Sequence, residues 1–377
     1  MNNVYITRLS KFLPNQPVDN NQMEKKLGKI DGETSKARRI VLRNNQIKTR
    51  YYALDEDGNV THNNAQLVSE AVNGLCDERF QKSEIELLSC GTSSPDQILP
   101  SHASMVHGYL KSGNLEVNSP SGACCSGMNA LRYGFMAVLS NQVKNAVCTG
   151  SERASTWLKS ELFKDEITHL KELEKSPVIA FRKEFLRWML SDGAGAFLLE
   201  NKPNGLLPLK IEWMEGFSYA HELDACMYSG SDKLENGTLK AWSEYTQDQW
   251  TEKSIFAIKQ DVKLLGENIL VKGVDSLKKA ISKYKIQPED ITYYLPHVSS
   301  YYFKERLYDE MVKQDVEIPW DNWFMNLSKV GNIGAGSIYI MLEELVTSGK
   351  LKKGDTILLS VPESARFSYS YAYLTVC

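Results

Sequence analysis

Three residues have side chains that could do chemistry and lie at turns between a stretch typical of a strand and one typical of a helix. Cys124 lies in SGACCSGMNAL (121–131), where small residues lead directly into an apolar helical pattern. His297 ends the apolar stretch YYLPHVSS (293–300), and Asn332 lies in the glycine-rich turn VGNIGAGS (330–337). Functional side chains gather at the ends of strands in folds that alternate strands and helices. The sequence therefore predicts one site built from these three turns.

The residue types indicate covalent catalysis. A cysteine at the N-terminus of a helix meets unpaired backbone N–H groups and the positive end of the helix dipole, which lower the pKa of a thiol. The same N–H groups could hold the oxyanion that forms when Cys124 attacks a thioester carbonyl. A histidine moves protons, and both histidine and asparagine donate hydrogen bonds. Taken singly, each residue has another interpretation. Cys124 is typical of a buried core thiol, His297 of a hydrogen-bonded core histidine, and Asn332 of a turn residue.

Several other kinds of protein are excluded by composition. The seven cysteines are irregularly spaced without a CxxC, which argues against a disulfide framework and a zinc site. No G-K-[ST] follows the glycine-rich turn and no G-x-G-x-x-G is present, so we expect no nucleotide cofactor and no metal. A formal charge of −3 gives no electrostatic case for nucleic acid. The chain has no apolar run of about 20 residues and no signal peptide, so we expect a cytoplasmic protein without membrane contact.

Two long stretches of the sequence repeat in the same order. Residues 81–94 resemble 286–300, and residues 121–152 resemble 331–363, with offsets of 206 and 211 residues. The repeat predicts two related α/β halves, 1–204 and 205–377, although any two strand–helix–strand stretches share some likeness. The duplication would place Cys124 and Asn332 at equivalent turns.

The elements that must position these residues follow from the hydrophobic pattern. Four apolar stretches without polar alternation predict strands buried on both faces, in mostly parallel sheets covered by helices. The N-terminal residues 1–14 predict an edge strand and residues 191–200 the last strand of the first half. Residues 157–188 are expected to be an inserted helical cap, and 229–262 a second excursion. The four buried strands are expected at 85–91, 146–150, 291–296 and 356–361.

The combination of cysteine, histidine and asparagine turns resembles the thiolase superfamily, and within it β-ketoacyl-acyl-carrier-protein synthase III and related condensing enzymes. This resemblance implies an α/β thiolase fold, with duplicated βαβαβαββ halves in a five-layer αβαβα arrangement. It also implies a homodimer in which residues 95–104 reach the partner's active site. The supporting segments are GTSSPDQILPSHAS (91–104), GACCSGMNAL (122–131), SDGAGA (191–196), LPHVSS (295–300), VGNIGAGS (330–337) and ESARFSYSYAYL (363–374).

The resemblance also implies the roles of the site residues. Residues 123–131 match the pattern A-C-x-S-x-x-x-A-L without a gap when Cys124 is the nucleophile, whereas Cys125 would require a deletion. Cys124 would take an acyl group from a thioester, with an oxyanion hole formed by the backbone of Cys124 and Ala365. His297 and Asn332 would hold the carbonyl oxygen of a second thioester. No cofactor or metal is implied.

Departures from the family pattern narrow the expected reaction. Residues 35–53 resemble the coenzyme A-binding region but contain no tryptophan, although Arg43 and Arg50 remain, and Tyr302 stands where an arginine is usual. This favours thioesters of an acyl carrier protein over those of coenzyme A. Ser364, Ala365 and Arg366 replace the glycines that usually precede the final strand, which predicts a reshaped pocket.

Within the family, the chain resembles the ketosynthase/cyclase branch that makes dialkylresorcinol and stilbene precursors. Three features together carry this resemblance: CCSGMNAL (124–131), PESARF (362–367) and the insertion at 157–188. The reaction implied is condensation of a β-ketoacyl thioester with a second acyl or enoyl thioester, giving a 2,5-disubstituted cyclohexane-1,3-dione. The alternatives are a synthase III of fatty-acid or polyketide initiation, a non-condensing acyltransferase, and a non-catalytic partner in a heterodimer.

Two expectations concern the insertion. It could line an acyl tunnel or form a solvated flap, and its basic residues could attract an acidic carrier protein or simply face solvent. The apolar candidates are Trp157, Leu158, Leu162, Phe163, Ile167, Phe181, Phe185 and Trp188, and the basic ones are Arg182, Lys183 and Arg187.

Overall fold

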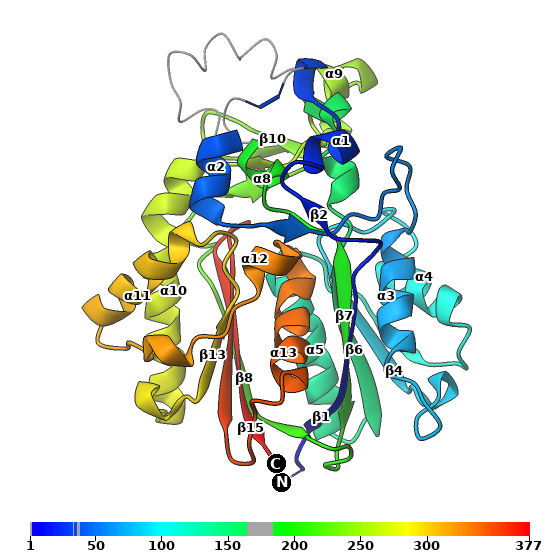
Figure 1. The fold of residues 1–377 in the computed structure, drawn as a ribbon, viewed down its shortest axis with the longest axis vertical. Coiled ribbons are helices and arrows are strands. Elements are labelled where there is room, and N and C mark those ends of the chain that lie inside the picture. The colour runs from blue at the N-terminus through cyan, green and yellow to red at the C-terminus, as the bar shows by residue number, and fades with distance from the viewer. Residues whose placement is uncertain (1, 33, 36–37, 164–183) are drawn as a thin grey trace.

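The structure is a computed structural model that describes residues 2–32, 34–35, 38–163 and 184–377 (Figure 1). Its centre is a nine-stranded mixed sheet in the order β13-β14-β15-β8-β1-β7-β6-β4-β5. The strands from the first part of the chain are β1 (Tyr5–Phe12), β4 (Leu87–Thr92), β5 (Glu116–Asn118), β6 (Asn145–Glu152) and β7 (Gly193–Glu200). Those from the second part are β8 (Leu209–Ser218), β13 (Tyr293–Pro296), β14 (Thr356–Glu363) and β15 (Ser368–Val376).

Helices divide the molecule into five layers (Figure 1). Helices α5 (Cys125–Leu139) and α13 (Ser337–Thr347) lie in the middle, between the two parts of the sheet. Helices α3 (Asn64–Asn73) and α4 (His102–Leu110) cover the outer face of the first part. Helices α10 (Val262–Tyr284) and α11 (Tyr302–Lys313) cover the outer face of the second. The expected αβαβα fold class is confirmed.

Burial on both faces explains why the central strands are almost uniformly apolar. Every residue of β4 is buried, as is every residue of β6 except the first, because helices cover both sides of the sheet. The middle layer packs so closely that glycine is required. A Cβ atom added at Gly127 of α5 or at Gly150 of β6 would lie 2.3 or 2.1 Å from the carbonyl oxygen of Ala335. These glycines allow the turn before α13 to approach both elements.

Two details differ from the expectations. The sheet is not mostly parallel, since only three of its eight strand pairings are (β13–β14, β4–β5 and β4–β6). The reason is that each part of the chain ends in two consecutive antiparallel strands, β6–β7 and β14–β15. Strand β1 is not an edge strand but lies between β7 and β8.

The two parts of the chain run through the same sequence of elements, with one exception. Strand β5 pairs in parallel with β4, whereas the corresponding position beside β13 holds only an isolated bridge between Tyr294 and Trp323. The division of the chain at residue 204 stays a prediction.

Smaller elements lie at the upper end of the sheet in Figure 1. The second excursion forms two short strand pairs, one of them with residues 227–228, and a helix. The first insertion contributes two short 3-10 turns (Ser155–Trp157 and Ser160–Phe163) and α8 (Glu184–Arg187), and its residues 164–183 lie outside the described part. No helix among the described residues is long and apolar enough to cross a membrane.

The remaining elements are β2 (Val18–Asp19), α1 (Met23–Leu27), a 3-10 turn (Ile30–Gly32), α2 (Arg38–Asn45), β3 (Thr49–Arg50), a 3-10 turn (Lys82–Glu84), β9 (Met227–Tyr228), β10 (Ser231–Lys233), β11 (Leu239–Ala241), a 3-10 turn (Trp242–Glu244), α9 (Gln247–Glu252), β12 (Lys259–Gln260), 3-10 turns (Pro288–Asp290 and Trp320–Asn322), α12 (Leu327–Val330) and a 3-10 turn (Gly334–Gly336).

Candidate active site

A large cavity lies where β6, β13 and β14 end, and the three predicted residues meet there. Cys124, His297 and Asn332 all line it, although they come from turns separated by more than half of the chain. The cavity together with its open mouth holds about 1180 Å³ of empty space, and its walls are mostly apolar. Apolar walls with a few convergent polar groups are typical of a small-molecule site.

The two adjacent cysteines point in different directions. Cys124 is the residue immediately before α5 and lines the cavity. Cys125 is the first residue of the helix, and its buried Sγ donates to the carbonyl oxygen of Val361 at 3.3 Å. Only the first thiol is therefore placed to meet a substrate. That Cys124 is the nucleophile remains a prediction, which this geometry supports.

Sequence reasoning missed a carboxylate at the start of α5. Glu363, the last residue of β14, accepts hydrogen bonds from the backbone N–H groups of Ala123 and Cys125, both at 3.0 Å. The same oxygen, Oε2 of Glu363, is therefore hydrogen-bonded to the backbone on each side of Cys124. A signal was present, because Glu363 stands within the unusual PESARF segment, directly before the residues that replace the family's glycines.

The expectation of a lowered thiol pKa is wrong for this environment. Burial raises the pKa of Cys124 well above its usual value, and the carboxylates of Glu363 and Glu152 raise it further. Two of the amides that would have stabilised a thiolate are already occupied by Glu363. Cys124 is therefore a neutral thiol at rest and must lose its proton as it reacts.

His297 is held rigidly and without charge. It follows Pro296 at the end of β13, and its backbone N–H donates to the carbonyl oxygen of Ser360 at 2.8 Å, which extends the pairing with β14. Burial lowers the pKa of His297 to about 4, because no nearby charge compensates for its loss of hydration. The imidazole is therefore neutral near pH 7, with one nitrogen able to donate and the other able to accept.

Asn332 presents an unpaired donor to the cavity. Its backbone N–H donates to the oxygen of Met189 and its backbone oxygen accepts from Ser191, each at 2.8 Å. Its side-chain Oδ1 accepts from the N–H of Gly334 at 2.9 Å. Within the described part of the chain, no acceptor is recorded for the side-chain Nδ2. These contacts orient the amide so that Nδ2 can donate to a substrate oxygen.

A second buried carboxylate, that of Glu152, lines the cavity. Glu152, at the end of β6, accepts from the backbone and hydroxyl of Ser93 and from the hydroxyl of Ser94, at 3.1, 2.8 and 2.6 Å. It also accepts from the N–H of Ala335 at 3.1 Å. Burial raises its pKa, and these hydrogen bonds partly oppose that effect. Glu152 thereby joins the loop after β4 to the turn that carries Asn332.

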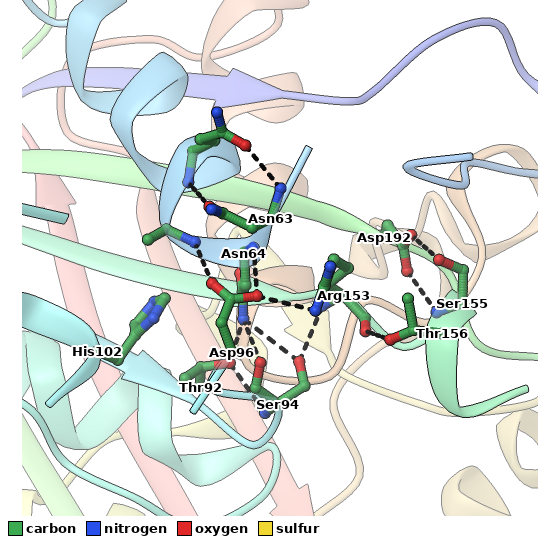
Figure 2. A network of polar contacts seen from close by, with 12 residues as sticks. Asn63, Asn64, Thr92, Ser94, Asp96, His102, Arg153, Ser155, Thr156 and Asp192 are labelled. Atoms are coloured by element: carbon green, nitrogen blue, oxygen red, sulfur yellow. Dashed lines mark hydrogen bonds and ion pairs between the residues drawn. The ribbon is translucent and has the colours of Figure 1, made fainter. Parts of the chain in front are cut away.

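The loop after β4 is anchored by a polar network, shown in Figure 2. The Asp96 carboxylate accepts from the first two backbone N–H groups of α3, those of Asn64 and Ala65, at 2.9 and 3.0 Å. It also pairs with the Arg153 guanidinium at 3.0 Å, and the backbone N–H of Arg153 donates to Ser94 at 2.8 Å. A carboxylate at a helix N-terminus is stabilising, so residues 94–96 are firmly positioned beside the site.

The two predicted oxyanion-hole residues are placed differently. Among the described residues, the backbone N–H of Cys124 has no recorded acceptor apart from its own sulfur, so it is available to a substrate. Ala365 does not line the cavity, and its backbone oxygen accepts from Cys226 and Met227 at 2.8 and 3.2 Å. Ser364 lines the cavity instead. The contribution of Ala365 remains a prediction.

Among the candidate tunnel residues of the first insertion whose side chains the structure describes, one lines the cavity and three do not. Trp157 lines the cavity, whereas Leu158 and Trp188 are buried in a neighbouring apolar cluster and Leu162 is 37% exposed. The other candidates, which are Ile167, Phe181, Arg182, Lys183 and the side chains of Phe163 and Phe185, lie outside the described part.

The predicted basic residues also differ in exposure. Arg187 is buried, and it donates to the backbone oxygens of Leu158 and Gly28, each at 2.8 Å. It is therefore not a surface charge for a carrier protein. Arg50 is also completely buried, whereas Arg43 and Tyr302 are exposed. All seven cysteines are free thiols, and no group of metal-ligating side chains is found among the described residues.

Comparisons with known proteins agree with this geometry. Residues 281–362 match the family model for the 3-oxoacyl-[acyl-carrier-protein] synthase III C-terminal region. The β-ketoacyl-[acyl-carrier-protein] synthase III of Chlorobaculum tepidum is 25% identical over 381 residues, with 98% of each chain covered. The 3-oxoacyl-[acyl-carrier-protein] synthase III structure from Aquifex aeolicus has a TM-score of 0.72 at 19% identity, with 99% of both chains covered. The OleA structure from Xanthomonas campestris with bound lauric acid and lauroyl-CoA has a TM-score of 0.72 at 18% identity, again with 99% of both chains covered.

The family match lies in the part of the chain that supplies His297 and Asn332, and the full-length relative extends the similarity over the part that supplies Cys124. The fold places these three residues around one cavity. The chain is therefore similar over nearly its whole length to β-ketoacyl-[acyl-carrier-protein] synthase III enzymes, and it is an acyl-transferring condensing enzyme that forms carbon–carbon bonds.

Proposed function

We propose that this enzyme is a ketosynthase/cyclase. It condenses a β-ketoacyl thioester with a second acyl or enoyl thioester and closes a ring, giving a 2,5-disubstituted cyclohexane-1,3-dione. The observation that carries the proposal is one cavity that is lined by Cys124, His297 and Asn332 and whose other walls are mostly apolar. Such walls suit acyl groups longer than acetyl. Ser364, one of the residues that stand where the resemblance leads us to expect glycines, also lines this cavity.

In the first half-reaction, Cys124 attacks a thioester carbonyl. The thiol proton passes to the departing thiolate, either directly or through the neutral imidazole of His297, and the acyl group stays on sulfur. The unpaired N–H of Cys124 donates to the oxyanion of the tetrahedral intermediate. The raised pKa of the thiol favours a proton transfer that accompanies attack over a thiolate formed in advance.

In the second half-reaction, His297 and Asn332 act together. A neutral imidazole N–H and the Asn332 Nδ2 both donate to the carbonyl oxygen of the second thioester, which stabilises the enolate formed at its α-carbon. That carbon, the α-carbon of the β-ketoacyl thioester, adds to the β-carbon of an enoyl group on Cys124, and the proton it lost returns to the α-carbon of that enoyl group. The γ-carbon of the β-ketoacyl chain then attacks the Cys124 thioester carbonyl, which closes the ring and releases the sulfur, and its own proton leaves with that sulfur as a thiol. Water hydrolyses the remaining carrier thioester to a carboxylic acid and the carrier thiol, and loss of CO2 gives the cyclohexane-1,3-dione.

The proposed acyl donors are thioesters of an acyl carrier protein. Two features support this choice over coenzyme A: residues 35–53 contain no tryptophan, and Arg50 is completely buried rather than exposed at an entrance. The names of the relatives also refer to an acyl carrier protein.

The proposed assembly is a homodimer. Ile98 and Leu99 are large apolar residues that are 74% and 83% exposed, at the tip of a loop whose base is fixed by Asp96. Such exposure is unfavourable in water, and a second copy of the chain would cover it.

Intact-protein mass spectrometry tests the proposed function. The wild-type enzyme is incubated with a β-ketoacyl carrier protein and an enoyl thioester, beside Cys124→Ala and the matched control Cys125→Ala, and small products are analysed. We expect an acyl adduct that only Cys124→Ala removes, and a product with the mass of a cyclohexanedione. An adduct with a linear β-keto product would instead indicate a synthase III of chain initiation. An adduct without any condensed product would indicate a non-condensing acyltransferase.

A further inference from the structure

The wall of the cavity contains a polar pair in addition to the three site residues. Gln260, the last residue of β12, and Ser364, directly after β14, both line the cavity. The side-chain Nε2 of Gln260 donates to the hydroxyl oxygen of Ser364 at 3.2 Å. Gln260 is only 7% exposed, so this hydrogen bond lies inside the protein rather than on its surface.

The backbone holds the two partners together. In the pairing of β12 with β9, Gln260 lies opposite Met227. The backbone N–H groups of Cys226 and Met227 both donate to the oxygen of Ala365, at 2.8 and 3.2 Å. The short β9–β12 ribbon is therefore fixed to the turn that carries Ser364, and the contact between the two side chains does not depend on one hydrogen bond alone.

The position of Ser364 relative to the nucleophile follows from its neighbour in the chain. Glu363 binds the backbone on each side of Cys124, and Ser364 is the next residue. Both Cys124 and Ser364 line the cavity. A side-chain hydroxyl is therefore present in the wall next to the nucleophile, at a position where the resemblance leads us to expect glycine, which has no side chain.

The hydroxyl of Ser364 still has a hydrogen to offer to a ligand. Within the described part of the chain, its recorded acceptor is the thioether sulfur of Met227 at 3.8 Å. A thioether is a weak acceptor, and a hydroxyl that accepts from an amide becomes a stronger donor. A carbonyl oxygen that entered the cavity would therefore replace the sulfur as the partner of Ser364.

Other serine hydroxyls of the cavity already have a strong acceptor. Those of Ser93 and Ser94 donate to the carboxylate of Glu152, at 2.8 and 2.6 Å. The cavity residues next to the polar pair are apolar, since Met227 contacts Ser364 and Ile258 precedes Gln260 by two residues. The hydroxyl of Ser364 is therefore a single donor in an apolar stretch of wall.

This arrangement distinguishes between the two acyl groups of the proposed reaction. A β-ketoacyl chain carries a polar atom beyond its thioester, the ketone oxygen. Burial of that oxygen among apolar side chains costs free energy unless a donor meets it. A saturated or enoyl chain has no oxygen at this point and gains nothing from the hydroxyl.

We propose that Ser364, oriented by Gln260, binds the ketone oxygen of the β-ketoacyl substrate and so selects this substrate over acyl chains without a ketone. The inference rests on the proposed function and adds the residues that recognise one of its two substrates. His297 and Asn332 hold the thioester oxygen of the same molecule. Because the α-carbon lies between the two carbonyl groups, holding both of them positions the carbon that forms the new bond.

Binding of two stable substrate analogues to the full-length protein, measured by calorimetry, tests the proposal. The probes are 3-oxodecanoyl-pantetheine and decanoyl-pantetheine with an amide in place of the thioester, which prevents acyl transfer to Cys124. They differ only in the ketone oxygen. In Ser364→Ala, the 3-oxo analogue should bind about fivefold more weakly, because one hydrogen bond is lost, whereas binding of the decanoyl analogue should change little.

Two further variants and a control separate recognition from packing. Ser364→Thr keeps a hydroxyl and should keep the wild-type preference for the 3-oxo analogue. Gln260→Met removes the amide that orients this hydroxyl, so we expect a smaller loss that is again limited to the 3-oxo analogue. The matched control is Ser299→Ala, which removes another cavity hydroxyl from the turn after β13 and should leave the preference unchanged.

The proposal would be overturned if Ser364→Ala weakened both analogues equally or neither of them, or if the selective loss occurred in Ser299→Ala instead. Product analysis separates this inference from the proposed function. Selective binding of the 3-oxo analogue through Ser364, by an enzyme that forms no cyclohexanedione, refutes the proposed function alone. Formation of a cyclohexanedione by an enzyme whose Ser364→Ala variant keeps the full preference refutes the role of Ser364 alone.

Discussion

Replacing Glu363 with glutamine should make Cys124 markedly more acidic. Glutamine has nearly the same shape, and its side-chain oxygen can still accept from the N–H groups of Ala123 and Cys125. The substitution therefore removes the negative charge while preserving the two hydrogen bonds of 3.0 Å that hold the turn. Because a nearby negative charge disfavours a thiolate, removing it must lower the thiol pKa.

The size of the effect follows from the geometry. An oxygen bonded to the amides on both sides of Cys124 lies roughly 6 Å from its sulfur, given the spacing of about 3.8 Å between successive Cα atoms. Two like charges at that distance repel by about 3 kcal/mol at an effective dielectric constant of about 20. This corresponds to about two pKa units. Local relaxation reduces the effect, so we expect a decrease of about one to two units.

The assay is the rate of Cys124 alkylation by iodoacetamide as a function of pH, followed by peptide mass spectrometry. The wild-type rate should keep rising to the highest accessible pH, because burial also raises the thiol pKa. The Glu363→Gln rate should reach half of its plateau at a lower pH. Glu305→Gln, which removes an exposed charge on α11, is the control. An unchanged or higher midpoint in Glu363→Gln would refute the reasoning, since a purely structural role predicts no shift.

Three further predictions follow from the structure. The rate of condensation from a pre-acylated enzyme should show no inflection near pH 6.5, because the pKa of about 4 leaves His297 neutral at that pH. An NMR titration of the His297 ring with a midpoint near pH 6.5 would contradict this. Gly150→Ala should destabilise the protein by about 3 kcal/mol or more in thermal or urea unfolding, because its Cβ would lie 2.1 Å from the Ala335 oxygen. The control Gly108→Ala on α4, with no atom within 4 Å of its Cβ, should instead stabilise by about 0.5–1 kcal/mol, and equal effects would argue against the packing explanation. Leu99→Asp should shift the mass measured by light scattering from a dimer toward a monomer of 42.6 kDa, whereas a wild-type protein already at that mass would exclude the proposed homodimer.

Much of the architecture was predictable because it depends on local pattern. The apolar runs that become β4, β6, β13 and β14 are continuous because both faces are covered. The serine-containing turns after β4 and β13 lead to helices α4 and α11. The repeated order of elements indicated two related halves. The position of β1 could not be predicted in the same way, because its own sequence does not show which strands flank it.

For the site too, local sequence predicted some features and the tertiary structure decided others. Residue type and turn context pointed to Cys124, His297 and Asn332, and the structure places all three around one cavity. Sequence reasoning also expected an activated thiol, since it considered only the helix that begins beside Cys124. Glu363 reverses that expectation, and it lies 240 residues from Ala123, whose amide it binds.

The sequence by itself thus determined which residues can do chemistry and which segments form strands and helices, because both depend on side-chain type and near neighbours. Only the tertiary structure decided the charge state of the nucleophile and the path of the cavity. Electrostatic interactions and empty space arise from atoms that are close in three dimensions, and here those atoms come from segments as much as 240 residues apart. The carboxylate beside Cys124 and the cavity lined by residues from both parts of the chain are the two clearest results of that folding.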